Sequence, residues 1–174
     1  MGTFGAKELA SGFRTVRKNT VQVAEDIPEA QYDYKAAPET MSVSEALRHL
    51  AFAPMMYEDM HREKRVTTLV GYDFPALIGR IRTAEGQPRS KAEIVELLTS
   101  EGERFASWLE SLTDEFLAET FSGPTGDVRS RLESLLSPKE HEMHHRGQLM
   151  LIERMLGIVP HLTRQRQQRQ QPAK

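Results

Sequence analysis

The chain has 174 residues, of which 39% are hydrophobic and 28% are charged, and its formal net charge is −2. This length and composition are those of one globular domain that can bury a hydrophobic core. No apolar run approaches the roughly 18 residues of a membrane span, and the N-terminus MGTFGAKELASGF lacks the apolar stretch of a secretory signal. We therefore expect a cytoplasmic protein with no membrane partner.

The sequence contains no cysteine, which excludes disulfides, thiolate nucleophiles and cysteine-ligated zinc. Any metal must then be bound by nitrogen and oxygen ligands. The tail RQRQQRQQPAK holds four basic residues and no acid, which leaves a net charge of −6 on the rest of the chain. An acidic body of this kind argues against nucleic acid as a partner.

Two helices are expected in the first third of the chain. Residues of one helical face recur at three- and four-residue steps and predict a helix from Ala6 to Glu25. After the loop PEAQYDYKAAPETM, Ser42 and Glu45 form a capping box that opens a second helix. Pro54 is expected to bend this helix. Its inward face comprises Ala46, His49, Leu50, Ala53, Tyr57 and Met60.

A long connection, VGYDFPALIGRIRTAEGQPR, separates the second helix from the third and is expected to hold one short helix. Ser90 and Glu93 make a second capping box that opens the third helix. Glu101 lies on the apolar face of that helix, about 20° from Ile94, and should point inward. An inward acid needs a partner, and three interpretations remain open: a general base, a hydrogen-bond acceptor for a ligand imidazole, or an edge residue that reaches solvent.

A fourth helical region begins near Asp127, and Pro138 after Ser137 predicts a helix start with a bend at that point. Gly157 and Pro160 predict its end. Four amphipathic helices, a long crossover between the second and third, and no strand-like alternation indicate an all-α four-helix bundle. We place this domain at residues 1–163, followed by a disordered Gln/Arg-rich tail at residues 164–174.

The stretch HEMHHRGQLMLIERMLGIVPH carries four of the six histidines. At roughly 100° per residue, His141 and His145 share one stripe with the apolar residues, and His144 lies at its edge. Charged residues fall on the opposite side of the helix and predict a solvent-exposed face there. They are Lys139, Glu142, Arg146, Glu153 and Arg154.

Two inward histidines on consecutive turns are unfavourable to bury unless both ring nitrogens find partners. A transition metal meets that need, because the i, i+4 spacing lets two imidazoles reach one ion. Hydrogen-bonded core histidines and a solvated patch are the alternatives. His49, on the buried face of the second helix, is the candidate third ligand, since three nitrogens from facing helices form a minimal open metal site.

SVSEALRHLAFA followed by HEMHHRGQLMLIERMLGIVP resembles the DinB/YfiT-like superfamily of four-helix proteins, over about residues 6–160. By position, the resemblance implies that His49, His141 and His145 bind one divalent ion, and that His144 does not ligate. Nickel or zinc is the expected ion, with iron, copper or manganese as alternatives. The resemblance also implies a homodimer.

The resemblance does not select a reaction, because the superfamily includes thiol transferases that use bacillithiol or mycothiol, a maleylpyruvate isomerase and hydrolases. A three-histidine ion with an open position can activate a bound thiol or water. We therefore expect a metal-dependent enzyme that combines a small-molecule substrate with a low-molecular-weight thiol or with water. Glu101 is the candidate catalytic acid or base, and Gln148 is expected to hydrogen-bond near the site. The alternative is a non-catalytic stress-response protein in which the metal stabilises the bundle.

Overall fold

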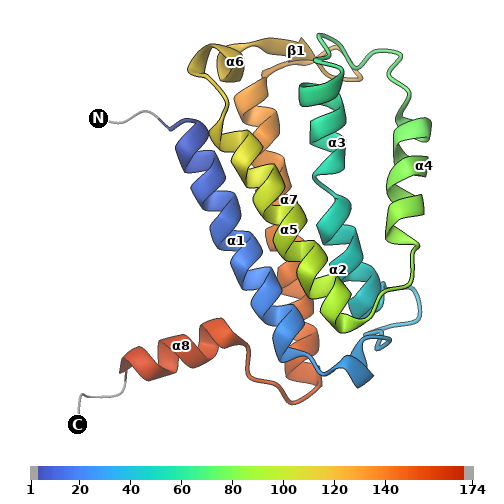
Figure 1. Cartoon of the computed structure of the whole chain (residues 1–174), viewed down its shortest axis with the longest axis vertical. Coiled ribbons are helices and arrows are strands. Elements are labelled where there is room, and N and C mark those ends of the chain that lie inside the picture. The colour runs from blue at the N-terminus through green and yellow to red at the C-terminus, as the bar shows by residue number, and fades with distance from the viewer. Residues whose placement is uncertain (1–3, 171–174) are drawn as a thin grey trace.

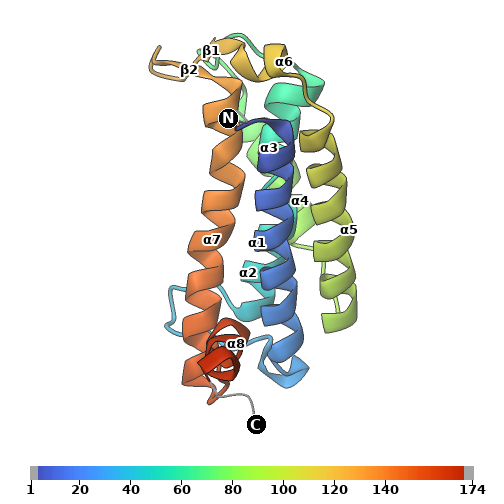
Figure 2. The same cartoon turned by 90° about the vertical axis from the view of Figure 1, so that its left-hand side faces the viewer.

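The computed structural model describes residues 4–170, and four helices form the body of the protein. Figure 1 and Figure 2 show them running side by side along the long axis. These helices are α1 (Ala6–Asp26), α2 (Val43–Phe52), α5 (Lys91–Glu110) and α7 (Arg131–Met155). The long crossover between α2 and α5 contains α4 (Phe74–Glu85), which lies outside the bundle beside α2. The predicted four-helix bundle and its crossover are therefore confirmed.

The second predicted helix is interrupted where proline was expected to bend it. After α2 the chain makes a turn at Pro54 and continues as α3 (Met55–Tyr57) and a π-helical turn, η2 (Glu58–Glu63). Proline has no backbone N–H, so the α-helical hydrogen bond that residue 54 would donate to the Leu50 carbonyl cannot form. The Leu50 carbonyl is thereby left for another donor.

Helix α7 is continuous, and the predicted helix start at Ser137 is wrong. Its N-cap is Ser130, whose hydroxyl accepts from the Glu133 amide while the Glu133 carboxylate accepts from the Ser130 amide at 2.6 Å. Pro138 lies inside the helix and removes one hydrogen bond. The helix persists because residues on both sides of Pro138, such as Leu135 and Glu142, are packed in the interior.

A short hairpin closes one end of the bundle, together with the helix α6 (Asp114–Ala118), as the top of Figure 2 shows. Strands β1 (Thr120–Ser122) and β2 (Val128–Ser130) pair antiparallel, with Phe121 opposite Arg129. The expectation of no strands was wrong here because three residues are too few to show alternation. Phe121 is buried, and its ring lies 5.1 Å from that of the buried His61.

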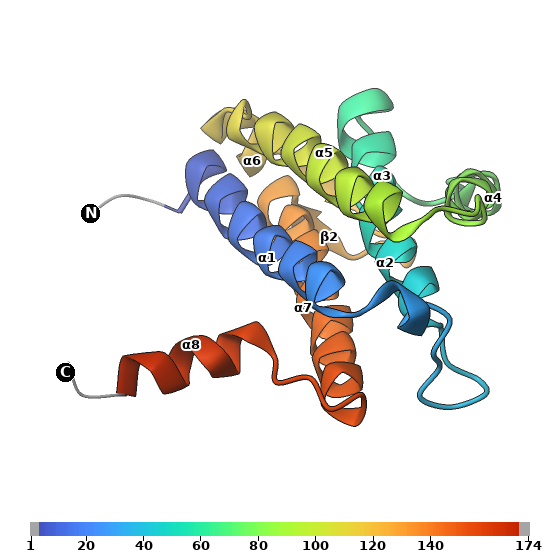
Figure 3. The ribbon, with the colours of Figure 1, turned by 60° about the horizontal axis from the view of Figure 1, so that its bottom comes forward.

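The C-terminal segment forms a helix, α8 (His161–Gln170), which projects from the end of α7 in Figure 3. Residues 164–170, for which the sequence predicts disorder, are therefore helical in the structure. Residues 171–174 lie outside the described range. Arginine and glutamine are good helix formers, and Arg164 anchors the helix through a 2.6 Å contact with Asp26. None of the helices described between residues 4 and 170 is long and apolar enough to cross a membrane.

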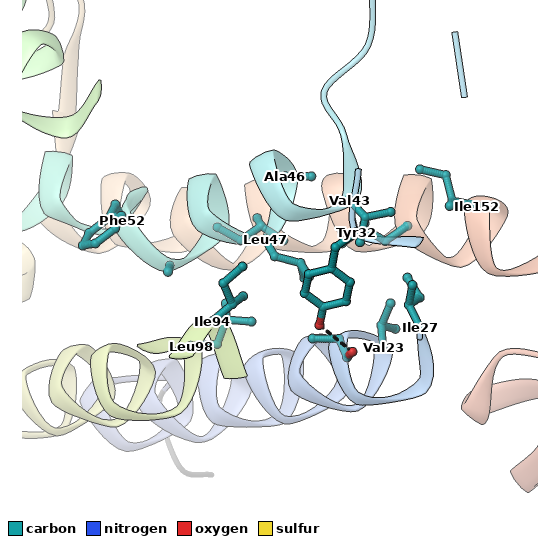
Figure 4. Close-up of a cluster of buried hydrophobic side chains, with 14 of the residues drawn as sticks. Val23, Ile27, Tyr32, Val43, Ala46, Leu47, Phe52, Ile94, Leu98 and Ile152 are labelled. Carbon is teal, nitrogen blue, oxygen red and sulfur yellow. Dashed lines mark hydrogen bonds between the residues drawn. The ribbon is translucent and has the colours of Figure 1, made fainter. Parts of the chain in front are cut away.

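The largest hydrophobic cluster fills the space between the four main helices (Figure 4). Tyr32, from the loop after α1, packs into this cluster with 5% of its surface exposed, and its hydroxyl donates to the Ala24 carbonyl at 2.8 Å. The labelled aliphatic members include Val23, Ile27, Val43, Leu47, Ile94, Leu98 and Ile152. The loop between α1 and α2 is thus fixed against the core.

The face of α7 that was predicted to meet solvent instead packs against α1, so that prediction is wrong for two acids. Glu142 and Glu153 are 2% and 0% exposed. Burial, followed by the nearby Asp26, raises the pKa of Glu153 to about 7. Helical periodicity predicts one buried stripe, but α7 contacts α1 on one side and α2 on another. A charged stripe can therefore be buried as well.

Glu142 forms an ion pair with Arg17 of α1, and both side chains are buried. Arg17 Nε lies 2.9 Å from Glu142 Oε1, and Nη2 lies 3.0 Å from Oε2. The guanidinium also donates to the Leu50 carbonyl of α2 at 2.8 Å and to the Leu98 carbonyl of α5 at 2.9 Å. One side chain on α1 therefore bonds to each of the other three main helices.

Two features of the sequence make this arrangement possible. Pro54 leaves the Leu50 carbonyl without its usual helical donor, and Arg17 supplies one. Gly102 on α5 provides space, because a Cβ atom at that position would lie 2.5 Å from Arg17 Cγ. Any larger residue at position 102 would displace the arginine.

We expect Glu142→Gln to lower the free energy of unfolding by about 3–5 kcal/mol, because it leaves the Arg17 guanidinium buried without a counter-charge. Urea denaturation measures this change. The double variant Arg17→Met, Glu142→Leu should recover part of the loss, since it removes both charges. A Glu142→Gln protein within about 1 kcal/mol of the parent would show that the buried pair does not govern stability.

Candidate metal centre

Three histidines from two helices converge where α2 faces α7. His49 comes from α2, and His141 and His145 come from consecutive turns of α7. One ring nitrogen from each lies within 4.8 Å of the other two. His49 Nε2 and His141 Nε2 are 3.1 Å apart. The structure thus brings together the three histidines that the sequence selected.

The chemistry and spacing of this group suit a transition metal ion. Zinc binds imidazole nitrogen at about 2.0–2.1 Å, so two nitrogens on one tetrahedral ion lie roughly 3.3 Å apart. The observed 3.1 Å is close to that separation. All three donors are imidazoles, a set that suits zinc, nickel, copper and iron. The residues present therefore fit a bound divalent ion.

The protonation state of the histidines also favours metal binding. Burial, followed by the proximity of His145 and His49, lowers the pKa of His141 to about 4. Burial likewise lowers the pKa of His145. Both rings are therefore neutral near pH 7, and the neutral imidazole is the form that binds metal ions.

Hydrogen bonds on the outer nitrogens orient two of the rings. His49 Nδ1 donates to Glu85 Oε1 at 2.8 Å, because an ionised carboxylate can only accept. His145 Nδ1 lies 2.8 Å from Gln148 Oε1, which confirms the expectation that Gln148 hydrogen-bonds near the site. Each bond occupies Nδ1 and leaves Nε2 as the nitrogen available for an ion.

Glu85 is the site residue that the sequence did not reveal. It is the last residue of α4, 36 positions after His49, and no motif or helical spacing connects the two. The contact between Glu85 and His49 forms because the long crossover places α4 beside α2. Only the tertiary structure identifies such a partner.

His144 and Glu101 do not join the histidine group. His144 is exposed, and its Nε2 atom lies 3.1 Å from Gln148 Nε2. This agrees with its predicted position at the edge of the inward-facing stripe. Glu101 pairs with Arg104 at 2.6 Å, and Arg104 also pairs with Glu58. Its carboxylate therefore faces an ion-pair cluster along α5. A catalytic role for Glu101 stays a prediction that this geometry does not support.

Two cavities reach the histidines. The first, of about 280 Å³, is lined by His49, Ala53, Met56, Tyr57, Ile78, Ile81, Arg82, Glu85 and His141. The second, of about 420 Å³, is lined by Ala36, Glu39, Thr40, Met41, Ala46, His145, Gln148, Leu149, Leu151 and Ile152. Apolar walls with a few polar groups are typical of small-molecule sites. Small molecules can therefore approach the group from two directions.

The fold and the site together define this protein as a helical bundle with a candidate three-histidine metal site beside two cavities. The DinB superfamily model matches residues 13–149. The chain belongs to this superfamily.

Known proteins of the same fold differ in activity. YjoA of Bacillus subtilis strain 168 is 23% identical over 154 residues, 87% of this chain and 91% of YjoA, and its solved structure superposes with a TM-score of 0.65. YfiT of Bacillus subtilis, described as a probable metal-dependent hydrolase with an unusual four-helix bundle topology, gives a TM-score of 0.69 at 17% identity over 91% of each chain.

A mycothiol-dependent maleylpyruvate isomerase gives a TM-score of 0.64 at 13% identity, over 86% of this chain and 63% of the isomerase. The chain therefore spans less than two thirds of that enzyme. At these sequence identities the similarity establishes a shared fold. It does not transfer the reactions of the relatives to this chain.

We expect the purified protein to bind about one zinc or nickel ion per chain, and alanine at His49, His141 or His145 to abolish most of this binding. Mass spectrometry of metal content after dialysis measures the stoichiometry. His144→Ala is the matched control and should keep its metal, because His144 lies outside the group. Full occupancy in His141→Ala, or loss only in His144→Ala, would show that the wrong histidines have been assigned.

We expect Glu85→Gln to weaken metal affinity by about 10- to 100-fold, since loss of the carboxylate partner reduces the basicity and alignment of His49. Competition with a chromophoric chelator gives the affinity. Glu96→Gln, at an exposed position on α5, is the charge-matched control and should bind as the parent does. Equal affinities for the two variants would rule out a supporting role for Glu85.

Proposed function

We propose that the protein is a metal-dependent enzyme in which His49, His141 and His145 bind one divalent ion, nickel or zinc, with iron, copper or manganese as alternatives. The observation that carries this proposal is the all-imidazole group beside two cavities. A divalent ion bound there would lower the pKa of a thiol or a water molecule and so supply a nucleophile at neutral pH.

The residues around the histidines would support this chemistry by orientation and by exclusion of water. Glu85 and Gln148 bond to Nδ1 of His49 and His145 and leave their Nε2 atoms available for an ion. Met56 and Ile81 line the first cavity with apolar surface. Such walls strengthen the electrostatic interactions of a bound substrate, since they displace water from around it.

A low-molecular-weight thiol is our preferred nucleophile, and water is the alternative. Two cavities that reach different histidines suit a reaction that joins two small molecules, whereas hydrolysis needs space for only one organic substrate. The isomerase of the same fold uses mycothiol, which supports the thiol, and YfiT supports the hydrolase. The preference therefore rests on the cavities together with this analogy.

A metal that only stabilises the bundle is the second alternative. Structural zinc sites are usually closed by four protein ligands, whereas catalytic sites keep an open position. Among residues 4–170 the histidine group has three members, and no carboxylate joins it as a ligand. This donor count favours the catalytic interpretation.

We expect the metal-loaded protein to accelerate conjugation of a small electrophile with a cellular thiol. His49→Ala should lose this activity while circular dichroism shows that it remains folded. Cleavage of activated esters without thiol, again dependent on the histidines, would replace the transferase with a hydrolase. If neither reaction is accelerated and the metal-free protein melts far below the loaded one, the metal is structural.

We also propose that the protein forms a homodimer, with the cytoplasm as its expected location. Met143, Leu151 and Met155 on α7 are 45%, 58% and 51% exposed and lie within about 120° of one another around the helix. A second copy would cover this apolar stripe. We expect Met155→Glu, which leaves the lining of the second cavity unchanged, to shift the protein to a monomer in sedimentation equilibrium. A monomeric parent protein at micromolar concentration would contradict the dimer.

A further inference from the structure

The two cavities beside the histidines differ in charge. The first is lined by one arginine, Arg82, and one acid, Glu85. The second has Glu39 as its charged residue and contains no lysine or arginine in its lining. The first cavity therefore offers an anionic group a positive partner, and the second offers it none.

Arg82 has a position that an ordinary surface arginine lacks. Arg82 is exposed to solvent, and it also lines a cavity that reaches His49 and His141. Within residues 4–170 its guanidinium makes no ion pair and no hydrogen bond, whereas Arg80 on the same helix pairs with Asp59. Its donors therefore remain available to a ligand.

The acid nearest to this arginine in sequence is engaged elsewhere. Glu85 directs its carboxylate at His49 Nδ1, at 2.8 Å, rather than at Arg82. An anionic ligand would be repelled by Glu85, which contacts His49, and attracted by Arg82. The charges thus define an orientation, with the anion beside Arg82 and the apolar body against Met56, Ile78 and the histidines.

We propose that the first cavity binds a small carboxylate with an apolar body of one or two rings or an equivalent chain, and that Arg82 pairs with its carboxylate. A guanidinium binds a carboxylate through two parallel hydrogen bonds, which fixes position as well as charge. A cavity of about 280 Å³ lies at the lower end of ligand-site volumes, which limits the ligand to a small molecule. That this carboxylate is a substrate rests on the proposed function, but its binding does not require the metal.

The direct test compares 2-naphthoate with the neutral 2-naphthamide on metal-free protein, by isothermal titration calorimetry. We expect naphthoate to bind about tenfold more tightly, since one charge-assisted pair distinguishes the two probes. Arg82→Gln should abolish this preference, and Arg82→Lys should retain part of it. Arg166→Gln on α8 removes the same charge from an exposed site far along the chain and should retain all of it.

Ile78→Trp tests the location, because it fills the cavity without removing a charge. It should bind neither probe, while its metal content stays at that of the parent. Equal binding of naphthoate and naphthamide by the parent protein would overturn the proposal. So would a preference that survives Arg82→Gln, or one that Arg166→Gln removes to the same extent.

The outcome can be separated from that of the proposed function. In metal-loaded enzyme, Arg82→Gln should raise KM for a carboxylate substrate by about tenfold and leave kcat and metal content nearly unchanged. Arg82-dependent binding of naphthoate by a protein that catalyses nothing would support the ligand site and contradict the enzyme. Turnover of a carboxylate substrate that is indifferent to Arg82 would support the enzyme and contradict the assignment of Arg82 to substrate binding.

Discussion

The arrangement of the bundle depends on the hydrogen bonds that the buried guanidinium of Arg17 makes. From α1 it reaches Glu142 on α7, the Leu50 carbonyl on α2 and the Leu98 carbonyl on α5. A buried charge must be paired and fully hydrogen-bonded, so the helices can approach only in an arrangement that supplies these partners. Glu142 adjoins His141 and Leu50 adjoins His49. The same contact therefore fixes the backbone beside two members of the histidine group.

The histidine group lies at the boundary between this fixed interior and more open surroundings. Helix α7 buries Glu142 against α1 and presents His141 to the cavity between α2 and α4. Helix α4 stands outside the bundle and lines a cavity beside the group, and Glu85 at the end of α4 hydrogen-bonds to His49. Burial keeps His141 neutral, whereas the cavity leaves the histidine group accessible. The fold thus combines a rigid ligand set with approach from solvent.

Local sequence rules predicted the helices and the histidine group but not the contacts made by the long connections. Capping boxes at Ser42 and Ser90 and helical periodicity placed α2 and α5, because caps and amphipathic faces are local properties. His49, His141 and His145 could be selected because an inward histidine is recognisable from its helical face. Glu85 could not, since its partner lies in another helix and the crossover alone brings them together.

The three errors each concern a residue whose side-chain or packing contacts differ from the interpretation that helical periodicity alone suggests. Helical periodicity assigns Glu142 to the face opposite the apolar stripe, yet Arg17 supplies a buried partner for it. Pro138 was read as a helix start, although the capping box at Ser130 and the packing of its flanks carry α7 through it. Glu101 was read as inward toward the site, but Arg104 holds it along α5. Only the partner of Glu142 lies far away in the sequence, whereas the Ser130 capping box and the Glu101–Arg104 pair are local contacts.

X-ray absorption spectroscopy at the metal edge, combined with the crystal structure of the zinc-loaded protein, tests the central claim most directly. We expect three imidazole nitrogens, from His49, His141 and His145, at about 2.0–2.1 Å from one ion, with water in the remaining coordination positions. A fourth protein ligand would contradict the open site. An ion bound elsewhere in the chain would contradict the histidine assignment itself.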